Sequence, residues 1–134
     1  GGLSDGGLRT VFLAGLDERV TCAVCAGMMT TWRDFVLHKS CMHTWMCYVP
    51  HLPRELEYPE ILGVRAPRAT LVLNTRQDAL FTLSEMERSE EILRRVYASA
   101  GAPERFQCSW FPGGHQFDRA MQAEAFDWFA RWLG

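Results

Sequence analysis

Three polar side chains have the types and the order along the chain of a nucleophilic triad. Ser4 lies in Gly2-Leu3-Ser4-Asp5-Gly6, a G-x-S-x-G pattern that is typical of a sharp turn from a strand into a helix. Asp78 and His115 follow in that order. In such a triad the histidine takes the serine proton, the acid orients the imidazole, and the serine oxygen attacks an acyl carbon. The three residues therefore predict hydrolysis through an acyl-serine intermediate.

The predicted secondary structure would bring these three residues to one edge of a sheet. Apolar runs predict strands, and Asp78 and His115 each follow one of them. Strands that alternate with helices predict the α/β class with a parallel sheet, whose carboxyl ends meet at a single edge. About three parallel strands flanked by helices are expected. The strands are expected at 19–27, 69–74 and 105–111, and the main helices at 5–17, 84–100 and 118–132.

Residues 29–67 form a predicted connecting or lid-like segment. A short helix is expected between Met28 and Ser40, where apolar and charged residues mix. The stretch from Pro50 to Pro67 contains four prolines, so we expect it to cross the surface with at most one helical turn. Further along, Ser84 and Glu87 have the spacing of a capping box at the start of a helix.

A second kind of chemistry is also possible within the connecting segment. His38, Cys41, His43 and Cys47 are four good zinc ligands within ten residues, although their spacing matches no standard zinc finger. A zinc-bound hydroxide could serve a metal-assisted ester or phosphotriester hydrolase. The competing interpretation is a Cys- and Trp-rich lid that packs over the sheet. The pair Cys22-x-x-Cys25 lies in a predicted core strand and is expected to be inert.

Composition limits the partners and the location of the chain. Its 134 residues suit a single domain, residues 1–134, and a net charge of −2 gives no basic surface for nucleic acid or an anionic membrane. No apolar run reaches the roughly 18 residues of a membrane span. Five cysteines at irregular spacing are expected to be mostly reduced, which favours the cytoplasm.

Several motifs together resemble one known family. They are Gly-Leu-Ser-Asp-Gly-Gly at 2–7, Met-Thr-Thr-Trp-Arg-Asp at 29–34, Leu-Val-Leu-Asn at 71–74, Phe-Pro-Gly-Gly-His at 111–115 and Ala-Phe-Asp-Trp-Phe at 125–129. The chain is similar to the C-terminal half of an α/β-hydrolase, in the branch of dienelactone hydrolases and acetyl xylan esterases. The resemblance implies Ser4 as nucleophile, Asp78 as acid and His115 as base. It also implies that no cofactor is required and that the substrates are small carboxylic esters or lactones.

The same resemblance implies a truncated fold, because members of the family have about eight strands and the strands before the elbow are missing here. The backbone amide of Asp5 is the expected oxyanion donor. The strand at 19–26 would have an open apolar edge, so we expect a homodimer that covers it. A different alternative is a non-catalytic fragment or subunit that needs a complementing chain.

Overall fold

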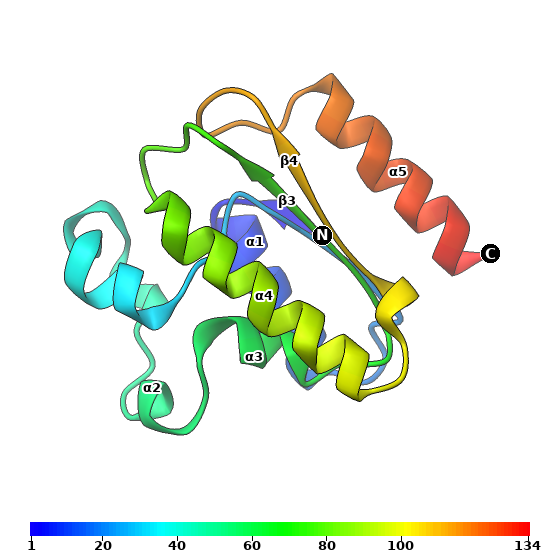
Figure 1. Ribbon diagram of the computed structural model, residues 1–134, viewed down its shortest axis with the longest axis horizontal. Coiled ribbons are helices and arrows are strands. Elements are labelled where there is room, and N and C mark those ends of the chain that lie inside the picture. The colour runs from blue at the N-terminus through cyan, green and yellow to red at the C-terminus, as the bar shows by residue number, and fades with distance from the viewer.

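A computed structural model describes all residues from 1 to 134, and it contains a four-stranded parallel sheet in the order β1-β2-β3-β4 (Figure 1). This architecture confirms the predicted α/β class. The sheet has one strand more than expected, because the short β1 pairs with β2 through Gly2 and Cys25 and through Leu3 and Ala26. The strands are β1 (Gly2–Leu3), β2 (Cys22–Ala26), β3 (Ala69–Thr75) and β4 (Phe106–Phe111).

Helices cover the two faces of the sheet unequally (Figure 1). The helices α1 (Asp5–Leu16), α3 (Tyr58–Gly63) and α4 (Leu83–Ser99) pack on one face, and α5 (Arg119–Leu133) packs on the other. Successive strand residues point to opposite faces. Ala23 and Cys25 therefore join the larger core with α1, whereas Val24 and Ala26 join the core under α5. The sheet is thus buried on both faces, as a parallel sheet requires.

The segment between β2 and β3 contains more helix than we predicted. It holds a π-helix at Asp34–His38, two 3-10 turns at Ser40–Met42 and Trp45–Cys47, and the helices α2 (Leu52–Glu55) and α3. The prediction of at most one helical turn after Pro50 was wrong. The reason is local: Pro59 lies in the first turn of α3, where proline is well tolerated, and Glu57 and Glu60 form a reciprocal capping box there.

The start of α4 also differs from the prediction. The helix begins at Leu83, so Ser84 lies inside it and forms no capping box with Glu87. Instead the backbone amide of Thr82, the N-cap residue, donates to Oδ2 of Asp34 at 2.9 Å. A carboxylate from a distant segment therefore takes the place of a local cap.

One buried arginine connects α1, the loop before β2, and β3. Arg65 is only 1% exposed and forms no ion pair. Its Nε donates to the carbonyl oxygen of Ala14 (3.3 Å), and Nη2 donates to that of Val20 (3.1 Å). Its Nη1 donates to the carbonyl oxygen of Ala69 (2.5 Å) and to the hydroxyl of Thr70. Burial lowers the pKa of the guanidinium, but the carbonyl dipoles around it compensate for lost water.

Two further expectations concern partners and membranes. β1 covers the carboxyl-terminal part of the predicted open edge, at Cys25 and Ala26, while Cys22–Val24 has no strand on that side. The homodimer along this edge therefore stays a prediction. No helix in the structure combines the length and the apolar composition needed to cross a lipid bilayer.

We predict that Arg65→Met strongly destabilises the fold. Methionine fills much of the space but leaves the carbonyl oxygens of Ala14, Val20 and Ala69 buried without donors, at about 1–3 kcal/mol for each unsatisfied group. Urea denaturation should show a loss of at least about 3 kcal/mol in the free energy of unfolding. Arg95→Met, at an exposed position on α4, should change it by less than about 0.5 kcal/mol.

We also predict that a single thiol reacts with a disulfide reagent in the folded protein. All five cysteines are free, and Cys41 alone is exposed. Burial raises the pKa of the Cys25 thiol to about 12 and also raises the pKa values of Cys22, Cys47 and Cys108. Because the thiolate is the reactive form, titration should count one thiol in the native state and five in denaturant. Cys41→Ser should abolish the native signal, and a residual signal would contradict the packing described here.

Candidate active site

Ser4 lies on a strained backbone turn between β1 and α1. Its φ of 56° and ψ of −119° are rare for a residue other than glycine. The turn is held on both sides: the amide of Ser4 donates to the carbonyl oxygen of Ala26 (3.0 Å), and its own carbonyl accepts from the amide of Leu8 (2.9 Å). The structure thus forms the sharp strand-to-helix turn that the G-x-S-x-G pattern predicts.

Two glycines allow the chain to fold back at this turn. A Cβ atom at Gly2 would lie 2.6 Å from the backbone of Gly6, and one at Gly7 would lie 2.7 Å from the Cβ atom of Met28. A Cβ atom at Gly6 would meet nothing within 4 Å. The close approach therefore requires glycine at positions 2 and 7, whereas position 6 has room for a Cβ atom.

Asp78 and His115 form a direct pair at the carboxyl ends of β3 and β4. Nδ1 of His115 lies 2.7 Å from Oδ2 of Asp78, whose side chain is completely buried. The other carboxylate oxygen, Oδ1, accepts from the amide of Leu80 at 3.0 Å. Because a carboxylate accepts and Nδ1 donates, the neutral imidazole has its lone pair on Nε2. The His115 side chain is 25% exposed, so the imidazole is in part open to solvent.

The imidazole of His115 also lies against the strand that supports the elbow. A Cβ atom on Gly27 would come within 3.1 Å of Cε1 of His115 and within 3.0 Å of Cδ1 of Leu3. Gly27 directly follows Ala26, the residue whose carbonyl binds the Ser4 amide. The ring therefore lies next to the turn that carries Ser4. Asp5, the predicted oxyanion donor, is the first residue of α1, where amides have no partner within the helix and favour negative charge.

The structure does not bring together the four zinc ligands that the sequence suggested, and no group of three or more His, Cys, Asp or Glu side chains is placed to hold a metal ion. Nε2 of His43 lies 3.0 Å from the carbonyl oxygen of Leu80, and Nδ1 of His38 lies 3.6 Å from Oδ1 of Asp34. Cys41 is exposed and Cys47 is buried in the core. The zinc alternative thus has no support in this geometry, because the short helices of this segment direct neighbouring residues to different partners.

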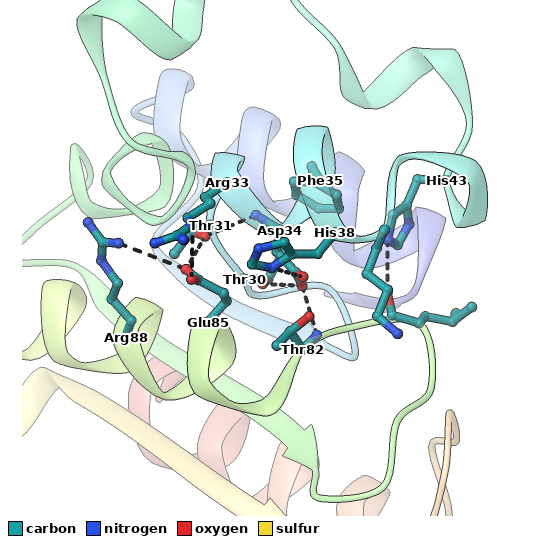
Figure 2. Close-up of polar contacts among 12 residues, drawn as sticks. Thr30, Thr31, Arg33, Asp34, Phe35, His38, His43, Thr82, Glu85 and Arg88 are labelled. Carbon is teal, nitrogen blue, oxygen red and sulfur yellow. Dashed lines mark hydrogen bonds and ion pairs between the residues drawn. The ribbon is translucent and has the colours of Figure 1, made fainter.

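Buried carboxylates hold the segment that follows β2 (Figure 2). Thr30 donates from its hydroxyl to Oδ2 of Asp34 at 2.8 Å, and this oxygen also accepts from the amide of Thr82. Thr31 donates to Oε2 of Glu85 at 2.6 Å. Both carboxylates are buried. The Met-Thr-Thr-Trp-Arg-Asp motif at 29–34 is therefore a structural clasp between the connecting segment and the start of α4.

An aromatic row that sequence reasoning missed leads from this segment to His115. The ring of Phe35 meets His43 edge to face at 4.8 Å, and His43 stacks on Phe81 at 5.1 Å between ring centroids. Phe81 in turn lies 6.4 Å from the ring of His115. Burial lowers the pKa of His43. The spacing of these residues along the sequence carries no signal of their contact.

Solved structures with low sequence identity share this fold. A glucuronoyl esterase of carbohydrate esterase family 15 from Caldicellulosiruptor kristjansonii matches 95% of the chain with a TM-score of 0.76 at 18% identity. A glucuronoyl esterase from Solibacter usitatus matches 99% with a TM-score of 0.75 at 14% identity. The methylesterase BT1017 matches 98% with a TM-score of 0.69 at 22% identity. The chain has an α/β-hydrolase fold.

A curated relative agrees with this assignment. The Bacillus subtilis (strain 168) protein named "Putative hydrolase YtaP" is 30% identical over 135 residues, which cover 98% of this chain. No protein-family model matches the sequence. The chain spans 44% of the length of that relative and 28–41% of the three solved structures. The part of the α/β-hydrolase fold seen here runs from the turn at Ser4, through Asp78 and His115, to the last helix.

The lowered pKa of His43 predicts a pH dependence of stability. An unfolded histidine takes up a proton near pH 6.5, whereas folded His43 resists protonation until a lower pH because its ring is buried. Between these two values the unfolded state binds more protons, so the free energy of unfolding falls as the pH falls below about 6.5. In thermal denaturation from pH 7.5 to 5, His43→Phe should show a smaller loss of Tm than the wild type. An equal loss in both proteins would contradict this reasoning.

Proposed function

We propose that the chain carries the catalytic triad of a serine-dependent ester hydrolase, with Ser4 as nucleophile, His115 as base and Asp78 as acid. The observation that carries the proposal is the 2.7 Å contact between Nδ1 of His115 and Oδ2 of Asp78. Because Nδ1 is engaged in that contact, Nε2 of His115 is the proton acceptor. The imidazole packs against Gly27, beside the strained turn of Ser4.

The reaction follows from these positions. Nε2 of His115 takes the hydroxyl proton of Ser4 as Oγ forms a bond to the ester carbonyl carbon, and Asp78 stabilises the resulting imidazolium. The negative oxygen of the tetrahedral intermediate faces the start of α1, where the amide of Asp5 is the proposed donor. The intermediate collapses, and the alcohol leaves with the proton from His115. Water then attacks the acyl-serine by the same steps and releases the acid.

The proposed substrates are small carboxylic esters or lactones. The match to "Putative hydrolase YtaP" supports a hydrolase, and the fold shared with a methylesterase and two glucuronoyl esterases favours ester bonds as the target class. Esters of carbohydrate acids are therefore a reasonable extension of the test panel. Because the chain spans less than half of these proteins, a complementing chain that completes the site remains an alternative to be tested with it.

The test is hydrolysis of p-nitrophenyl acetate by the wild type and by Ser4→Ala. We expect the variant to lose about a thousandfold or more in kcat/KM, because without the nucleophile only binding and oxyanion stabilisation remain. Ser99→Ala, which changes an exposed serine at the end of α4, is the matched control and should keep full activity. An unchanged rate in Ser4→Ala would remove Ser4 from the mechanism. Activity that appears only with an added upstream fragment would favour the complementation alternative.

A further inference from the structure

The connecting segment binds the turn that carries Asp78. Three of its side chains bind backbone groups of that turn, which spans residues 78–82. Nζ of Lys39 donates to the carbonyl oxygen of Ala79 at 2.9 Å, and Oδ2 of Asp34 accepts from the amide of Thr82 at 2.9 Å. Between these two contacts, Nε2 of His43 lies 3.0 Å from the carbonyl oxygen of Leu80 (Figure 2).

The contact of His43 leads directly to the acid of the triad. Because a carbonyl oxygen only accepts, Nε2 of His43 is the donor. The residue that it binds, Leu80, donates from its own amide to Oδ1 of Asp78 at 3.0 Å. The opposite oxygen of that carboxylate, Oδ2, receives Nδ1 of His115. One residue of the turn, Leu80, therefore connects His43 to the pair that orients the base.

The ring of His43 also supports His115 through packing. It lies between Phe35, which meets it at 84°, and Phe81, which stacks on it at 27°. Phe81 is buried and packs beside the imidazole of His115. The same side chain thus fixes the acid through hydrogen bonds and the base through an aromatic contact.

We propose that His43 is a positioning residue of the catalytic site, which holds the turn of Asp78 so that the Asp78 carboxylate keeps His115 in its productive tautomer and orientation. The proposal rests on the proposed function, since it assigns His43 a role in the triad. The contacts of His43 run to Leu80, Phe35 and Phe81 and not to the turn of Ser4, so its loss should leave substrate binding intact. It should slow the chemical step, because a misplacement of about 1 Å can cost about a hundredfold in rate.

Two variants separate the hydrogen bond from the packing. His43→Phe keeps an aromatic ring between Phe35 and Phe81 but has no donor for Leu80. His43→Gln places an amide donor near the position of Nε2. On p-nitrophenyl acetate we expect His43→Phe to lower kcat by about 10- to 100-fold with KM within about twofold of the wild type. His43→Gln should recover kcat to within about threefold. Lys39→Met, which removes a more exposed contact with the same turn, should have a smaller effect and serves if His43→Phe folds poorly.

The matched control is His51→Asn, on an exposed left-handed turn of the same segment, where asparagine is well tolerated. It should keep the wild-type kcat. A His43→Phe variant with wild-type kcat would overturn the proposal. So would equal losses of kcat in His43→Phe and His43→Gln, because the donor would then make no difference.

A second readout does not depend on turnover. The low-field proton resonance of Nδ1–H in His115 reports its hydrogen bond to Asp78. We expect this resonance to weaken or shift upfield in His43→Phe and to be preserved in His43→Gln and His51→Asn. An unaltered resonance in His43→Phe would contradict the proposal. If Ser4→Ala leaves the wild-type rate unchanged, the proposed function fails, and the resonance still decides whether His43 positions the pair.

Discussion

The tight turn at Ser4 is the constraint on which the arrangement of the site depends. A serine with a positive φ costs about 1–3 kcal/mol, so the surrounding structure must hold it there. β1 on one side and α1 on the other provide that support, and the carbonyl of Ala26 binds the Ser4 amide between them. The hydrogen bond to Ala26 also fixes the turn of Ser4 to the end of β2. Gly27, the residue after Ala26, lies against the imidazole of His115. Ser4 and His115 are therefore both positioned relative to one strand.

The sequence was sufficient for the features that depend on local pattern. Buried apolar runs predicted β2, β3 and β4 to within a few residues, and the order of Ser4, Asp78 and His115 predicted the pairing of the last two at the sheet edge. Whether Ser4 acts as the nucleophile stays a prediction. The elbow pattern predicted a turn that the backbone of Ser4 indeed adopts.

The features that were missed depend on partners far away in the sequence. The amide of Thr82 is capped by Asp34, 48 residues earlier, and Arg65 binds the carbonyl of Ala14, 51 residues earlier. No local pattern contains these contacts. The zinc alternative failed for a different reason. It assumed that His38, Cys41, His43 and Cys47 are close in space because they are close in the sequence. Within the segment around His43, a π-helix and short 3-10 turns send successive side chains in different directions.

The clasp formed by residues 29–34 and the start of α4 has a consequence for the mobility of the connecting segment. A segment of this length beside a catalytic pair has the size of a mobile flap, and flap opening limits turnover in many enzymes. Here opening would break the contacts of Asp34 with Thr82 and of His43 with Leu80, and it would release the turn that holds Asp78. Opening of the segment is therefore coupled to loss of the backbone contacts that hold the turn of Asp78, and with it to loss of the support for the pair of Asp78 and His115.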